Sequence, residues 1–101
     1  MSRYQMHVSS ETLELLDAIV ERMVSVFSIS PNEAVARINE QWFGQDLSSE
    51  DEVILHEDDY YWALFIYFGG NVPDWAPSAD RSAWSRKPPP SLDSGFWPSA
   101  E

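Results

Sequence analysis

The sequence predicts a small, mainly α-helical domain that begins with a short strand and ends in an extended arm rich in proline and tryptophan. Three observations support this fold class: apolar residues recur at helical spacing over two segments, a nine-residue apolar run follows at 60–68, and six of the seven prolines stand at or after Pro73. The 101 residues fit one small acidic helical domain at 1–70 and an arm at 71–101, which we expect to pack on the domain or on a partner.

The first two elements are a strand and a long helix. Residues 3–8 alternate polar and apolar side chains, a pattern typical of a short half-buried strand. Ser9 and Ser10 then offer an N-cap for a helix with acidic residues in its first turn. The three- and four-residue spacing predicts an amphipathic helix of about four to five turns. Its apolar stripe comprises Leu13, Leu16, Val20, Met23, Val24 and Phe27.

The second helix has clear signals at both ends. Ser30 is suited to cap it, Pro31 to occupy its first position, and Glu33 to complete a capping box with Ser30. Gly44 is well placed as a left-handed stop after the last turn. The buried face is expected to comprise Val35, Ile38 and Trp42, and the outer or flanking positions Arg37, Asn39, Glu40 and Gln41.

The run at 60–68 is apolar on every side, so its period alone fits either a helix or a strand. Tyr, Trp, Phe and Ile favour strands. Acidic residues before the run, two glycines after it, and the presence of Ala63 and Leu64 favour a buried helix. We expect this aromatic helix to be the core against which the first two helices pack.

The charge is strongly negative and unevenly distributed. The net charge is −11, and residues 1–70 carry thirteen acids against three arginines. Such a body repels nucleic acid and anionic membranes and attracts basic partners, although it also simply keeps a small protein dissolved. The absence of cysteine excludes disulfides and thiolate sites, and neither a signal-like stretch nor a span of membrane length is present. We therefore expect a cytoplasmic protein.

These features favour a non-enzymatic protein that binds a basic partner protein, in the manner of an antitoxin or an immunity protein. The acidic run at 46–59 and three tryptophans are the predicted partner-binding residues: Asp46, Glu50, Asp51, Glu52, Glu57, Asp58, Asp59, Trp62, Trp75 and Trp84. A metal site at 56–59 is an alternative interpretation of this run, but the loose pattern favours a solvated acidic helix start. We predict no catalytic residue, metal or cofactor.

The arm has no periodic pattern from residue 71 onward, yet it carries four large aromatic residues. We therefore expect it to lie on a surface, either of its own chain or of a neighbour in an assembly. Its bases Arg81, Arg86 and Lys87 are the nearest candidates to cover the acidic run. The hypothesis is that the arm folds back over 46–59 and is pinned by Trp75 and Trp84.

Residues 3–42 also resemble a ribbon-helix-helix unit. The segments that carry the resemblance are RYQMHV as the ribbon, ETLELLDAIVERM as the first helix and SPNEAVARINEQ as the second. The resemblance implies a homodimer whose paired ribbons read the major groove of DNA through Arg3, Gln5 and His7. Phe27-Ser28-Ile29 stands where that family has a glycine between its helices. A dimeric DNA-binding transcriptional regulator is thus the alternative function, and it leaves residues 43–101 without a role.

Overall fold

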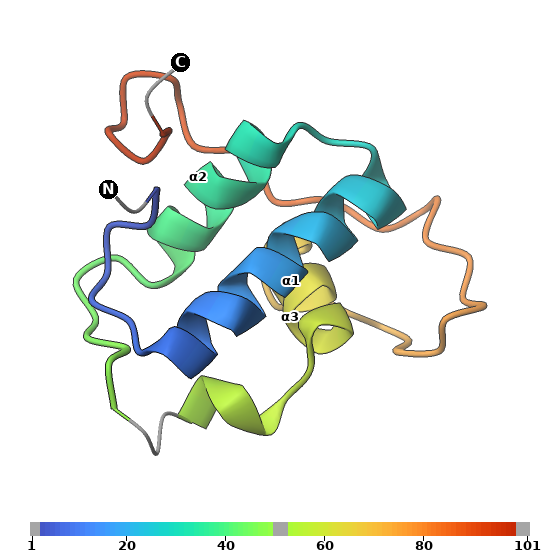
Figure 1. Ribbon diagram of the computed structural model, residues 1–101. Coiled ribbons are helices and arrows are strands. Elements are labelled where there is room, and N and C mark those ends of the chain that lie inside the picture. Colours follow the sequence, from blue (N-terminus) through green and yellow to red (C-terminus); the bar gives the residue numbers. More distant parts are fainter. Residues whose placement is uncertain (1–2, 50–52, 99–101) are drawn as a thin grey trace.

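The computed structural model describes residues 3–49 and 53–98 and is mainly helical. Four elements follow one another in these ranges: α1 (Ser10–Phe27), α2 (Pro31–Gln41), the short 3-10 helix η1 (Val53–His56) and α3 (Asp59–Tyr67). Figure 1 shows α1 crossing in front of α3, with α2 beside them and the chain after α3 returning toward α2. The prediction of a mainly helical chain is confirmed.

The ends of α1 follow from its caps. The Ser9 hydroxyl accepts a hydrogen bond from the Thr12 backbone N–H at 3.1 Å, which satisfies one of the free donors of the first turn. After Phe27 the chain turns at Ser28, whose φ of 56° is left-handed. Its N–H donates to the Val24 carbonyl at 3.0 Å. Of the predicted stripe, Leu16, Val20 and Met23 lie at the centre of the core together with Ile19, whereas Leu13 is 37% exposed.

Helix α2 begins as predicted but uses its glutamate differently. Pro31 is its first residue, and the Ser30 hydroxyl accepts from the Glu33 N–H at 3.0 Å. The Glu33 carboxylate accepts from Arg37 Nε at 2.9 Å, one turn along the helix. The second half of the capping box is therefore replaced by an ion pair. Arg37 and Asn39, expected on the outside, are 2% and 0% exposed.

The predicted N-terminal strand is wrong. Tyr4 and Met6 are buried while Gln5 is exposed, so the alternation correctly marks which side chains face the core. Within residues 3–49 and 53–98, however, the only β-type pairing is one isolated parallel bridge between Val8 and Leu47. The backbone finds a side chain in place of a neighbouring strand, since the Gln5 N–H donates to Asn39 Oδ1 at 2.9 Å.

The apolar run forms helix α3, as the sequence predicts. Asp58 is its N-cap, and Gly69 and Gly70 follow it with φ values of 62° and 87°. Aromatic pairs join α3 to both other helices. Tyr67 stacks on Phe27 with ring centroids 3.8 Å apart. Trp62 meets Trp42 edge-on at 5.3 Å. The run is thus the core element that the sequence indicates.

Residues 71–98 contain no helix or strand and return across α3 and α2. The Lys87 N–H donates to the Tyr67 carbonyl at 2.9 Å, at the end of α3. Farther along, the Phe96 carbonyl accepts from Asn39 of α2 at 2.9 Å. No helix in the described part of the chain is long and apolar enough to cross a membrane.

Candidate protein-binding surface

Three of the predicted acidic residues gather at the start of α3. Asp58 Oδ1 accepts from the Tyr61 N–H at 2.8 Å, as an N-cap does. Asp59 pairs with Arg22 of α1, with 3.0 Å between Oδ2 and Nε. Glu57 is exposed. Carboxylates are favoured at this end of a helix dipole. Helix formation and one ion pair therefore account for Asp58 and Asp59, and Glu57 faces solvent.

Asp46 lies in a different setting, in the loop beside the N-terminal segment. Its Oδ1 accepts from the Ser48 hydroxyl at 2.6 Å and from the Ser48 N–H at 2.9 Å. These hydrogen bonds lower the pKa of the Asp46 carboxyl. The adjacent Leu47 N–H donates to the His7 carbonyl at 2.7 Å. The predicted residues Glu50, Asp51 and Glu52 lie outside the described residues.

The three predicted tryptophan anchors have different environments. Trp62 is half-buried and packs against the core, and its indole N–H donates to the Ile54 carbonyl at 2.8 Å. Trp84 meets Phe68 edge-on at 5.1 Å. Trp75 is 40% exposed and stacks on Tyr61 with centroids 4.7 Å apart. Of the three, Trp75 offers the most surface to a partner.

Arg37 holds the arm against α2 and was not predicted to do so. Its Nη1 donates to the Lys87 carbonyl at 2.7 Å, and its guanidinium carbon lies 4.7 Å from the centre of the Tyr67 ring. Together with the Glu33 ion pair, these contacts offset part of the cost of a buried charge, while Nη2 is buried without a hydrogen-bond partner among the described residues. Two neighbours in α2, Ala36 and Ile38, are fully buried as well. Because α2 is buried on more than one face, an arginine in this helix needs partners within the chain.

Asn39 joins both ends of the described chain to α2. Its Oδ1 accepts from the Gln5 N–H, and its Nδ2 donates to the carbonyls of Arg3 at 3.2 Å and Phe96 at 2.9 Å. Gln5 in turn donates to the Gly95 carbonyl through its side-chain amide. Through these three hydrogen bonds, the fully buried asparagine holds the N-terminal segment and the arm against α2. No local sequence pattern marks it.

The residues of the DNA-binding alternative are partly engaged within the chain. Arg3 Nη2 pairs with Asp17 at 3.0 Å, and the Gln5 amide is bound to the arm. The Tyr4 hydroxyl donates to the same carboxylate at 2.6 Å. Burial of Asp17 is outweighed by these two hydrogen bonds, so its pKa lies below the ordinary value. This arrangement adds no support to the alternative, which stays a prediction.

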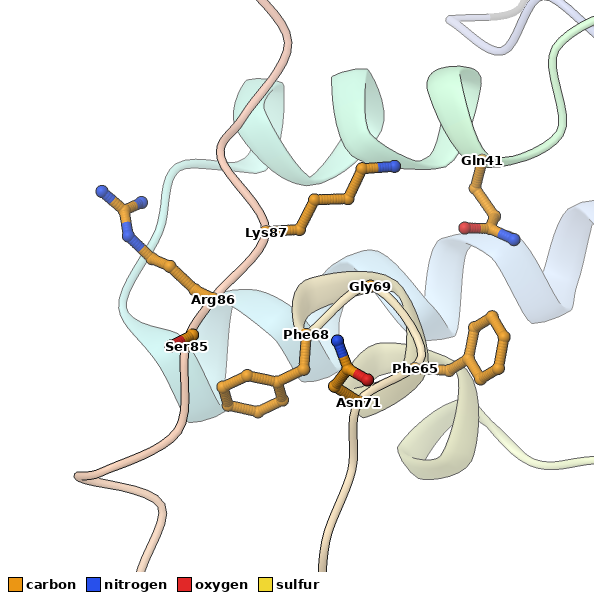
Figure 2. A pocket seen from close by; sticks show the side chains of 8 residues that line it. All are labelled: Gln41, Phe65, Phe68, Gly69, Asn71, Ser85, Arg86 and Lys87. Atoms are coloured by element: carbon orange, nitrogen blue, oxygen red, sulfur yellow. The ribbon is translucent and has the colours of Figure 1, made fainter.

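The hollow drawn in Figure 2 lies between the end of α3, the end of α2 and the arm, and it measures about 520 Å³. It is lined by Gln41, Phe65 and Lys87, together with the neighbouring arm residues Ser85 and Arg86. The Lys87 ammonium pairs with Glu40 at 3.2 Å. Figure 2 shows the Arg86 side chain directed to the opposite side of the arm. Because the two bases diverge, the hollow does not form a convergent anion site.

The ion pairs leave an excess of exposed carboxylates. Arg3, Arg22 and Arg37 pair with Asp17, Asp59 and Glu33, and the arm's Lys87 pairs with Glu40. Several exposed acids have no ion pair among the residues that the structure describes: Glu11, Glu14, Glu21, Asp46, Glu57 and Asp58. The first three lie on α1, outside the acidic run that the sequence singles out.

The same part of the chain holds no group of three or more His, Asp or Glu side chains that could bind a metal ion. Its candidate site is therefore a charged surface, and Trp75, stacked on the half-buried Tyr61, is the most exposed of the predicted tryptophans. Comparison with known proteins found no family model, no curated protein and no solved structure that matches this chain.

Proposed function

We propose that this protein is a non-enzymatic interaction protein that binds a basic protein partner through its carboxylate surface. The observation that carries the proposal is the state of its charges. Each arginine of the N-terminal segment and the helices is paired with an acid of the same chain, whereas Glu11, Glu14 and Glu21 of α1 face solvent without an ion pair in the described structure.

This distribution favours attraction of a cationic partner for a simple reason. An approaching lysine or arginine meets carboxylates whose negative charge no nearby base neutralises, in a molecule of net charge −11. Long-range attraction of this kind raises association rates by about tenfold to a thousandfold at low salt. It falls with ionic strength, because exposed charges are screened beyond about 8 Å at physiological salt.

A binding experiment in two stages tests the proposal. The tagged full-length chain is used to capture partners from cells of its source, and the captured protein is then purified. Its association rate with the chain is measured in a series of sodium chloride concentrations. We expect a basic protein whose association rate falls as salt rises. An acidic partner, or a basic one whose association rate does not change with salt, would overturn the proposal.

A charge-neutral variant refines the test. Glu14→Gln combined with Glu21→Gln keeps the shape of two exposed side chains and removes two negative charges. We expect slower association with an almost unchanged dissociation rate if these residues steer the partner, and a faster dissociation rate as well if they contact it. Matched removal of charge on the arm, Asp74→Asn with Asp93→Asn, is the control for net charge alone.

A further inference from the structure

An apolar groove runs between α1 and the start of α2. Val20, Val24 and Pro31 supply its apolar lining, and Arg3, Glu21 and Ser25 its polar lining. Its volume is about 330 Å³. Ligand pockets begin at about 300 Å³, so the groove has room for one or two large side chains of a partner. Helix α1 therefore borders an apolar groove as well as carrying the exposed carboxylates of Glu14 and Glu21.

The exposed ridge of α1 borders this groove. Glu14 and Glu21 are seven residues apart and therefore lie on the same side of the helix, two turns from each other. Ser25 continues the line one turn farther on. A second hollow of about 260 Å³ lies across the ridge, where Arg22 and Asp59 form their ion pair. Glu21 and Ser25 line both hollows, so they stand between them.

The bases near the groove are already occupied. Arg3 is bound to Asp17, and Arg22 to Asp59. The charges left to an incoming molecule are thus those of Glu14 and Glu21. An anionic ligand or a phosphate surface would be repelled here. A second copy of this chain, with its own net charge of −11, would be repelled as well.

We infer that the groove between α1 and α2 is the docking site for a cationic amphipathic helix of the basic partner. Its aliphatic side chains would enter the groove beside Val24 and Pro31, over the buried Val20, and its lysines or arginines would reach Glu14 and Glu21. Apolar anchoring with a charged rim is the usual form of helix-in-groove recognition. This inference rests on the proposed function and moves the site from the acidic run at 46–59 to α1.

The test uses two synthetic peptides of identical composition. One is a lysine–leucine peptide of about four turns whose leucines share one helical face. The other carries the same residues in an order that scatters the leucines around the helix. Each is titrated into the ¹⁵N-labelled full-length chain. The amphipathic peptide is expected to bind about tenfold more tightly and to shift the amide signals of Val20, Glu21, Val24 and Ser25.

Two matched variants confine the site further. Ser25→Arg replaces an exposed residue and places a long cationic side chain at the groove. It should weaken binding of the amphipathic peptide about tenfold. Ser78→Arg adds the same charge at an exposed position of the arm and should weaken it less than twofold. Circular dichroism checks that both variants keep the helical content of the parent.

The outcomes separate the inference from the proposed function. If both peptides bind equally and the shifts centre on residues 57–59, the charged surface binds cations but the groove is not the site. If neither peptide binds at low salt, both the groove and the cation-binding surface are wrong. If a small apolar molecule alone fills the groove and the amphipathic peptide does not displace it, the groove is not a helix-docking site.

Discussion

Replacing Asn39 with alanine is expected to loosen both the N-terminal segment and the C-terminal arm. The side chain is fully buried and makes three hydrogen bonds to backbone groups, at Gln5, Arg3 and Phe96. A net contribution of about 0.5–1.5 kcal/mol for each of the three bonds gives a loss of about 1.5–4.5 kcal/mol in the free energy of unfolding. That is a large share of the total of about 5–15 kcal/mol typical of a domain.

Urea unfolding followed by tryptophan fluorescence measures this loss directly. Trp97 lies close to the affected contact, since its indole N–H donates to Pro90 of the arm and the adjacent Phe96 is bound to Asn39. The control is Asn32→Ala, which removes the same side chain from an exposed position of α2. It should change the free energy of unfolding by less than about 0.5 kcal/mol.

A second variant tests the direction of the hydrogen bonds. Asn39→Asp keeps the shape of the side chain but places an oxygen where an amide N–H now donates to two carbonyl oxygens. At neutral pH it should cost more than Asn39→Ala, because a buried carboxylate then faces acceptors. If Asn39→Ala lowers the free energy of unfolding no more than Asn32→Ala does, or if Asn39→Asp lowers it less than Asn39→Ala, Asn39 does not hold the N-terminal segment and the arm in this way.

Four further outcomes are expected. Ser28→Gly should be more stable than Ser28→Ala by about 1 kcal/mol in thermal unfolding, because the left-handed φ of 56° disfavours a Cβ atom. Trp84→Ala should lower stability toward urea by about 1–2 kcal/mol through loss of the contact with Phe68. Asp17 has a lowered pKa, so its stabilising effect is present above pH 3.8 and is lost as pH falls through the lowered value. In Asp17→Asn, the free energy of unfolding in urea should therefore depend less on pH in the acidic range. Burial and the hydrogen bond to Asp17 raise the pKa of Tyr4, so its stabilising effect is present below pH 10.0 and is lost at higher pH. In Tyr4→Phe, the free energy of unfolding should therefore depend less on pH in the alkaline range.

The helices could be predicted because their signals are local. Ser9, Ser30 and Asp58 each occupy the N-cap position and accept a backbone hydrogen bond there. The three-to-four-residue spacing of α1 indicates the face that is buried. The strand prediction failed because a period of two reports only which side chains are buried. It does not report what the backbone bonds to, and Asn39, far away in sequence, takes that role.

Much of the candidate surface could not be predicted, because it depends on contacts distant in sequence. Arg37 and Asn39 look like solvent-facing residues on a helix with one apolar face. Their partners lie far away in sequence: residues 87–96 of the arm for both, the N-terminal segment for Asn39 and Tyr67 for Arg37. Likewise, the glutamates of α1 gain significance only after the ion pairs are known. The acidic run at 46–59 was more conspicuous in the sequence, but two of its described acids serve α3 as an N-cap and in an ion pair.

The course of the arm decides which helix remains open to a partner. Its hydrogen bonds, ion pair and ring contacts with the rest of the described chain all go to the N-terminal segment, α2, α3 and the residues that follow these helices. Lys87, one of the bases expected to shield the acidic run, is instead bound to Glu40. The arm therefore does not compete for the glutamates of α1. The outer face of α1 therefore combines accessibility, carboxylates without an ion pair in the described structure and an apolar groove, and the basic partner that we propose would dock there while the arm stays in place.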